Sequence, residues 1–263
     1  MKKLLLLCIA LVAVLTSCAN DDSSENSFPE DSSILPKTIS YTYPDISLGT
    51  NSKITLSYDG NKILTSVEDD TKTIFTYTGN VITRQEKFDV DSKGIETKDI
   101  EVNYTYENGK LKTRVTKNKY PDGEYIGKTV YIHTSENLVS FTNYSVNSDT
   151  KIETKINDGS LTYENDNLIK YQSVNGNSVS TRFFEYDGKN NPCKNILGFN
   201  LLLLDGIDFS VNNILKINRV ETEFPDPIIY LTTYVYNDKN YPIKHISFAG
   251  DGKSIEYEIE YTY

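Results

Sequence analysis

The sequence predicts an all-β protein, a single antiparallel meander of about 14 to 18 strands that curls or closes like a barrel. The chain has 20 Tyr, 10 Phe and no Trp, a composition that suits half-buried strands better than helices. A short phrase of two aromatic residues, a polar turn and one apolar residue recurs along the body. Further turn signals containing Gly, Asn, Asp or Pro separate the copies, so each copy predicts one hairpin.

The first 17 residues predict a signal peptide. Lys2 and Lys3 precede an apolar run of secretory length, which is too short to span a bilayer as a helix. The run ends in Leu15-Thr16-Ser17-Cys18, which resembles the lipobox of bacterial lipoproteins. The resemblance implies cleavage before Cys18 and acylation of that residue, which would anchor the protein in a membrane. The alternative is an ordinary cleaved signal peptide followed by a chance cysteine.

Residues 18–37 are predicted to be a disordered acidic tether, because they contain few apolar groups. Asp21 and Asp22 follow the cysteine closely, and this cluster resembles the surface-export signal of Bacteroidota lipoproteins. The resemblance implies an outer-membrane lipoprotein at the cell surface; a periplasm-facing lipoprotein with a plain solvated tether is the alternative. The net charge of -10 argues against nucleic acid as a partner.

Residues 38–263 are predicted to form one repeat-built β domain. The phrase is clearest at residues 104–112, YTYENGKLK, where Tyr104 and Tyr106 share one face of a strand. Asn108-Gly109 suits a tight hairpin turn, and Leu111 begins the return strand. The central positions of the seven copies are Tyr58, Tyr77, Tyr106, His133, Tyr163, Tyr186 and Tyr236. Five copies have an apolar residue five positions later: Ile63, Ile82, Leu111, Leu138 and Leu168.

The phrase resembles the tyrosine-aspartate repeats of wall-associated and Rhs-type proteins. The body as a whole resembles a Bacteroidota lipoprotein family of unknown function that has a porin-like fold. The resemblance rests on YDGKNNPCKN at 186–195, the apolar insert at 196–209, Asn212-Asn213-Ile214, and YVYNDKNYPIK at 234–244. It implies a curled antiparallel sheet and no particular activity.

An apolar insert within residues 193–220 interrupts the repeat. Its central part includes Phe199, Leu201, Leu202, Leu203 and Leu204. Gly198, Asp205 and Gly206 make it too short for a membrane span. We expect a short helix or loop that caps one end of the sheet; the alternative is a lid or docking patch for a lipid or a protein.

No sequence pattern indicates a catalytic centre, a metal site or a cofactor site. His133 occupies an aromatic position of the repeat, so we expect it to be a half-buried structural residue. Cys193 is expected to be a buried small hydrophobic residue rather than a nucleophile. Residues 89–94 begin like a calcium loop, but Lys93 and Ile100 replace oxygen ligands, so a hairpin tip is favoured.

Three functions remain open on the sequence alone. The first is a non-enzymatic surface lipoprotein whose β domain is a binding or structural module for a glycan, lipid or protein ligand. The second is a carrier that holds a lipid or another hydrophobic ligand in the curled sheet. The third is an enzyme acting on polysaccharides, since abundant carboxylates could supply a catalytic pair. Closure of the sheet decides between scaffold and carrier, because a filled interior fits the former and a roomy one the latter.

Overall fold

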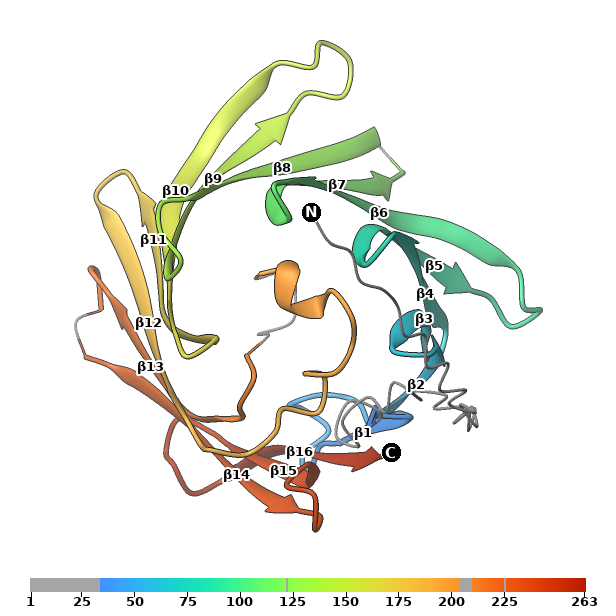
Figure 1. The fold of residues 1–263 in the computed structure, drawn as a ribbon, viewed down its shortest axis with the longest axis vertical. Coiled ribbons are helices and arrows are strands. Elements are labelled where there is room, and N and C mark those ends of the chain that lie inside the picture. Colours follow the sequence, from blue (N-terminus) through green and yellow to red (C-terminus); the bar gives the residue numbers. More distant parts are fainter. Residues whose placement is uncertain (1–33, 122, 204–209, 225) are drawn as a thin grey trace, which may run out of the picture.

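The computed structural model describes residues 34–121, 123–203, 210–224 and 226–263. They form a closed antiparallel barrel of 16 strands in sequence order, which β1 and β16 close (Figure 1). The strands are β1 Thr38–Thr42, β2 Ser52–Asp59, β3 Lys62–Glu68, β4 Thr71–Thr78, β5 Val81–Val90, β6 Glu96–Glu107, β7 Lys110–Tyr120, β8 Gly123–His133, β9 Leu138–Val146, β10 Glu153–Glu164, β11 Asn167–Asn175, β12 Ser178–Tyr186, β13 Ile214–Glu221, β14 Ile228–Tyr236, β15 Pro242–Phe248 and β16 Ile255–Thr262. The predicted all-β meander is confirmed.

The repeated phrase produces one local geometry. Tyr106 pairs directly with Leu111, and Thr105 pairs with Thr113, so Lys112 is an extra residue in a β-bulge. The same register shift occurs at all six tyrosine copies of the phrase, Tyr58, Tyr77, Tyr106, Tyr163, Tyr186 and Tyr236. Each tyrosine therefore faces the barrel interior together with the residue opposite it.

The histidine copy departs from this rule. We expected Leu138 to be the partner of His133, but His133 pairs with Val139, one residue later. A longer turn is the cause, because the backbone N–H groups of Thr134 and Ser135 both donate to the carbonyl oxygen of Leu138. Val139 consequently takes the buried inward position, with 3% of its surface exposed.

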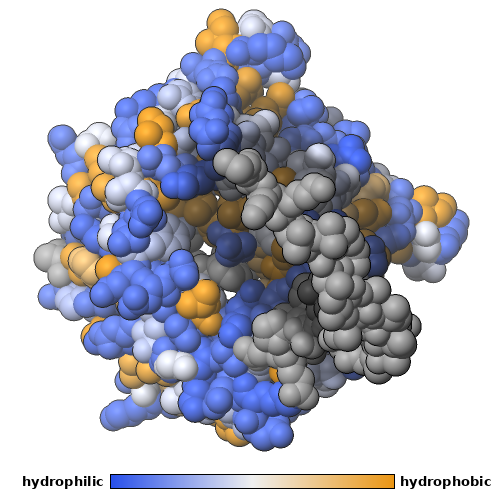
Figure 2. Space-filling view, viewed as in Figure 1, coloured by the Kyte–Doolittle hydropathy of each residue, from blue (hydrophilic) through white to orange (hydrophobic). Residues whose placement is uncertain are grey.

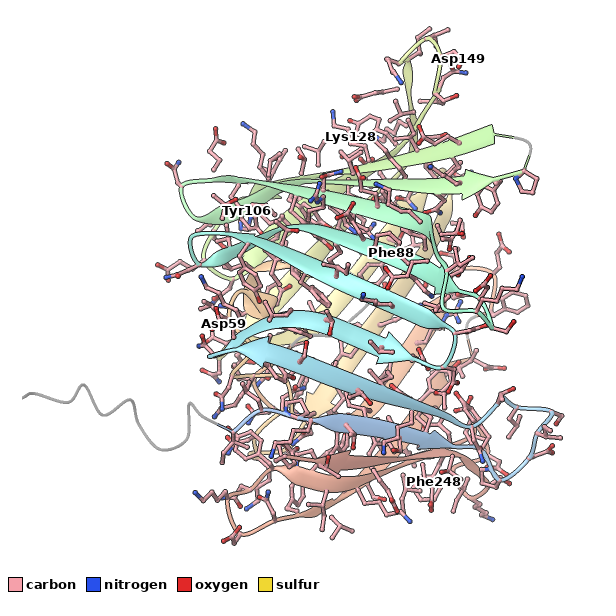
Figure 3. The ribbon with its side chains drawn as sticks, turned by 90° about the vertical axis from the view of Figure 1, so that its right-hand side faces the viewer. Asp59, Phe88, Tyr106, Lys128, Asp149 and Phe248 are labelled. Carbon is pink, nitrogen blue, oxygen red and sulfur yellow. The ribbon has the colours of Figure 1, made fainter. Side chains whose placement is uncertain are left out.

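All phrase turns lie at one end of the barrel. Figure 3 shows Asp59 and Tyr106 toward that end and Asp149 toward the opposite end. Between β12 and β13, residues 187–203 and 210–213 lie inside the barrel ring and contain the short 3-10 helix η2, Phe199–Leu201 (Figure 1). We call these residues the plug. The predicted insert boundaries of 193–220 were wrong, because β13 already begins at Ile214.

The last residues of the predicted tether are not disordered. The carbonyl oxygen of Ile34 accepts a hydrogen bond from the side-chain amide of Asn195 in the plug. The carbonyl oxygen of Pro36 accepts one from the Tyr58 hydroxyl at 2.7 Å. Residues 34–37 are thus attached to the plugged end, and the structure does not describe residues 1–33.

The interior and the outer wall have opposite character. The main buried cluster consists of inward-facing residues from strands and plug, among them Ile63, Phe75, Tyr104, Phe141, Phe184 and Phe199. Outward positions are mainly Thr, Ser, Lys and Glu, with exposed hydrophobic residues such as Leu64, Ile132 and Val235 among them. The space-filling view down the barrel shows a largely hydrophilic end face with scattered hydrophobic residues around a central hollow (Figure 2). Outward ion pairs join neighbouring strands, such as Lys112 with Glu107 and Lys216 with Glu185.

Candidate functional site

The plugged end is fixed by side-chain donors that reach backbone carbonyl oxygens on neighbouring segments. The donor and acceptor pairs are Tyr58 to Pro36, Tyr77 to Leu197, Tyr106 to Ile82, His133 to Leu111, Tyr186 to Leu168 and Tyr234 to Ile214, all between 2.7 and 2.9 Å. Because a carbonyl oxygen only accepts, Nε2 of His133 carries the proton. His133 therefore has the same structural role as the tyrosines of the other copies: its side chain donates a hydrogen bond to a backbone carbonyl oxygen on a neighbouring segment.

The plug is bound to the barrel along its length. Tyr77 donates its hydroxyl proton to the carbonyl oxygen of Leu197, and the N–H of Leu197 donates to the carbonyl oxygen of Asn61. Asn195 donates to the Tyr241 hydroxyl at 2.8 Å. Gly198 has a φ of 80°, and a Cβ there would lie 3.2 Å from the Asn80 carbonyl oxygen. A side chain at position 198 would therefore strain the backbone and crowd the β4–β5 turn.

The predicted cap residues occupy different environments. Phe199 and Leu202 are each 3% exposed and belong to the main buried cluster. Leu203 packs against that cluster while partly exposed, and Leu201 is also partly exposed. Leu204 lies outside the described residues. The described part of the insert therefore packs against the inner wall.

A cavity of about 480 Å³ separates the plug from the inner wall of the barrel. The plug contributes Cys193, Ile196 and Phe199, and the wall contributes strands β1–β4 and β13–β16. The wall residues that line the cavity include Ser66, Phe75, Ile217, Tyr234, His245 and Tyr257. The volume falls within the range typical of small-molecule sites, and the lining is mainly apolar and aromatic.

His245 is the main polar feature of this cavity. Its ring lies 5.0 Å from that of Tyr234 and 5.7 Å from that of Tyr257, measured between ring centroids. Burial lowers the pKa of His245 to about 4, so the imidazole is neutral at pH 7. Its Nε2 atom is buried and makes no hydrogen bond to any described residue. A buried polar atom of this kind takes its partner from an ordered water or from a bound molecule.

Burial keeps several other titratable groups around the cavity uncharged near neutral pH, through their pKa values. Burial raises the pKa of Tyr41 to about 12, and it raises the pKa values of Tyr234 and Tyr261 as well. Burial raises the pKa of the Cys193 thiol to about 12, which disfavours the nucleophilic thiolate. The cavity therefore offers neutral hydrogen-bonding groups in an apolar surround.

A second hollow of about 610 Å³ lies on the other side of the plug, against the turn ends of strands β7–β10. Charged residues from the turns and the plug line it, namely Lys110, Glu136, Asp166 and Lys194. Apolar residues also line it, among them Leu111, Val139 and Leu201, and the charged groups distinguish it from the cavity beside His245.

The structure brings together residues that the repeat pattern did not single out. His245, Tyr257, Ile259 and Tyr261 all line the cavity, and none of them is the central residue of one of the seven copies of the phrase. Alternation along β15 and β16 was the available signal, because His245, Ser247, Tyr257 and Ile259 occupy inward positions. The sequence does not indicate that these two strands lie beside β1 and face the plug.

Among the described residues, no group of three or more His, Cys, Asp or Glu side chains is placed to hold a metal ion. The hairpin tip at Asp91 has a structural explanation, since the Asp91 carboxylate accepts hydrogen bonds from the N–H groups of Lys93 and Ile95.

The predicted lipidation site Cys18 and the export residues Asp21 and Asp22 lie outside the described residues. In the described parts of the chain, no helix is long and apolar enough to cross a membrane.

The barrel resembles solved structures from Bacteroides. A porin-like protein from Bacteroides vulgatus ATCC 8482 matches with a TM-score of 0.59 and 13% identity, covering 88% of this chain and 98% of that one. A porin-like protein from Bacteroides uniformis ATCC 8492 matches with a TM-score of 0.49 and 12% identity, covering 86% and 97%. No protein-family model and no curated protein matches the chain.

At such low identity, the first match establishes a shared fold only. The expected porin-like fold is thus supported, whereas the relationship to tyrosine-aspartate repeats remains a prediction.

Proposed function

We propose that this protein is a lipid-anchored, non-catalytic barrel that binds a small, mainly apolar ligand in its lumen. The observation that carries the proposal is the cavity of about 480 Å³ between plug and wall, with the unpartnered Nε2 of His245 inside an aromatic surround. A barrel of 16 strands is too wide for its own side chains to fill. The plug fills only part of the interior, which favours a binding chamber over a solid scaffold.

The polar outer wall supports a barrel that stands in water. Membrane-spanning barrels carry an outward apolar band flanked by aromatic girdles, and a Lys at the bilayer midplane costs about 2–4 kcal/mol. Here outward hydroxyls pair across strands, as between Thr105 and Thr113 at 2.6 Å, and outward ion pairs join β13 to β12 and β15 to β16. Anchoring would then fall to the acylated Cys18. Since residues 34–37 are attached at the plugged end, that end would face the membrane.

The predicted absence of catalysis rests on the chemistry of the cavity. Its histidine and its cysteine are both uncharged at pH 7, and neither has a charged partner that would activate it. No carboxylate is among the residues that line the cavity. These features suit binding by shape, apolar contact and a few hydrogen bonds.

Binding is tested with the chain from Ala19 onward, because residues 34–263 supply every strand and the plug. The neutral fluorescent probe N-phenyl-1-naphthylamine should bind to this chain and brighten. Ser66→Trp, which places a large side chain in the cavity, should abolish that binding. Thr65→Trp is the matched control, since Thr65 lies on the outer wall and contacts Ser57. Equal probe binding by both variants would show that the cavity is not the site.

The predicted membrane anchor and the predicted export signal are tested separately. Cys18→Ala should release the protein from membranes, because no other apolar surface is expected to anchor it. Replacing Asp21 and Asp22 with Ala should reduce protease accessibility on intact cells while leaving acylation unchanged. A Cys18→Ala protein that stays in the membrane fraction would refute the anchor, and unchanged protease accessibility of the second variant would refute the export role.

A further inference from the structure

We infer that the lumen ligand is an amphipathic anion, whose apolar body lies in the cavity beside His245 and whose carboxylate or phosphate group meets Arg182 and Arg219. This inference rests on the proposed function and adds the chemical class of the ligand. It arises from the distribution of arginines in an acidic protein. The chain has a net charge of -10 and contains four arginines, Arg84, Arg114, Arg182 and Arg219.

Three of the four arginines face the barrel interior. Arg114 pairs with the buried Tyr104, and Arg182 pairs with Tyr171, which packs against the main buried cluster. Arg219 is the direct partner of Arg182 on the neighbouring strand, and directly paired residues share a face of the sheet. Arg84 pairs with Asn103 on the outer wall, where it forms an ion pair with Glu86. The outer wall thus carries one arginine and the lumen three.

Arg182 and Arg219 place two like charges directly opposite each other, an arrangement that destabilises a sheet unless a negative charge compensates. Glu221 compensates one of them, because its carboxylate accepts a hydrogen bond from Nε of Arg219 at 2.8 Å. Arg182, Arg219 and Glu221 together carry a net charge of one positive unit. The Arg182 guanidinium lies over the Tyr171 ring, 5.6 Å from its centroid, and forms no ion pair with any described residue. A ligand anion at this point would remove the repulsion between the two arginines.

The arginine pair lies next to the cavity. Ile217 lines the cavity, and Arg219 is the next inward residue on β13, about 7 Å further along the strand. On the adjacent strand, Thr232 lines the cavity and Tyr230 is the next inward residue toward the open end. Glu221 and, to a lesser extent, Tyr230 raise the pKa of the Arg219 guanidinium, so Tyr230 lies near that group. A molecule with its apolar part in the cavity can therefore reach the arginines with a charged end.

Arg182 is also exposed, although it faces inward. The lumen at this level is therefore accessible to solvent, whereas the cavity on its plug side is mainly apolar. This change from an apolar to a hydrated, positively charged environment matches the two ends of an amphipathic anion. Guanidinium groups bind carboxylate and phosphate through paired hydrogen bonds, so both head groups fit the same site.

The test is isothermal titration calorimetry on the chain from Ala19 onward, with decanoate, decyl phosphate, decanol and acetate at fixed low salt. Decanoate or decyl phosphate should bind at least about tenfold more tightly than decanol, since hydrogen bonds to a charged group contribute about 1.5–3 kcal/mol. The tighter of the two identifies the head group. Acetate should not bind measurably, because it lacks the apolar body.

The variant is the double substitution Arg182→Gln and Arg219→Gln, and Arg84→Gln on the outer wall is the matched control. The double variant should lose the preference for the anions over decanol, while decanol binding stays unchanged. The control should keep the preference.

Equal binding of decanol and decanoate by the unmodified chain would overturn the anion assignment and leave the proposed cavity intact. Acetate binding as tight as decanoate binding would show an anion site that is independent of the cavity, which also overturns the inference. Failure of every decyl compound and of N-phenyl-1-naphthylamine to bind would instead refute the proposed function itself.

Discussion

The hydroxyl group of Tyr106 donates a hydrogen bond to the carbonyl oxygen of Ile82 across two hairpins, at 2.7 Å. Ile82 is the inward partner of Tyr77, so the tyrosine of one phrase is bonded to the bulge region of the phrase before it. His133 to Leu111 and Tyr186 to Leu168 repeat the relationship. The repeat therefore encodes the contact between successive hairpins as well as the hairpins themselves.

Truncation of Tyr106 should destabilise the barrel more than truncation of a tyrosine outside the phrase. Tyr106→Ala should reduce the free energy of unfolding by about 2–4 kcal/mol, because it removes a packed aromatic ring and a hydrogen bond. Tyr106→Phe should cost about 1 kcal/mol, because only the hydrogen bond is lost. Tyr120→Ala is the control and should cost under about 1 kcal/mol, since Tyr120 is 56% exposed. Equal losses for the two Ala variants in chemical denaturation would show that the repeat does not mark the core.

A charge in the plug should damage the whole barrel. Leu202 is 3% exposed, so Leu202→Asp would bury a carboxylate that has no partner and should destabilise the protein by several kcal/mol. Asn200→Asp in the adjacent 3-10 helix η2 is the control, because Asn200 is exposed and the change should be nearly neutral. Melting temperatures from circular dichroism measure both. A stable Leu202→Asp protein that no longer takes up an apolar probe would make the plug a lid rather than a cap.

Stability should rise with pH between about 4 and 6.5 because of His245. Its folded pKa is about 4 against an ordinary value of 6.5, so the unfolded chain binds more protons in that window. The associated stability is present above pH 6.5 and lost as the pH falls toward 4, and it amounts to at most about 3 kcal/mol. Denaturation at several pH values should show a smaller slope for His245→Asn than for the unmodified chain. The same slope in both proteins would contradict the buried neutral state of His245.

Cys193 should react slowly in the folded protein. In the chain from Ala19 onward it is the only cysteine, and burial raises the pKa of its thiol to about 12. Its remaining exposed surface faces the cavity beside His245. Alkylation by iodoacetamide at pH 8 should therefore be at least about tenfold slower before unfolding than after it, because only the thiolate attacks. Mass spectrometry over a time course measures the rate, and fast labelling of the native chain would contradict the buried thiol.

Local sequence rules were sufficient for the hairpins. Turn residues that tolerate positive φ fix the position of each turn, as at Asn108 and Gly109 with φ values of 52° and 75°. Period-two alternation then decides which residues share the inner face, so Tyr104, Tyr106 and Leu111 could be placed there without a structure. The same rules do not reveal that the phrase hides a β-bulge, nor that the longer turn after His133 shifts its partner from Leu138 to Val139.

The sequence by itself determined the all-β class, the repeated hairpins and the apolar character of the insert, because these depend on contacts between near neighbours in the chain. Only the tertiary structure decided that β1 pairs with β16, that the plug lies against the wall, and that Arg182 meets Arg219 beside the cavity. Barrel closure depends on the summed twist and stagger of all 16 strands, which no local pattern records. The cavity beside His245 is the space left between wall and plug, so its position and lining follow from closure.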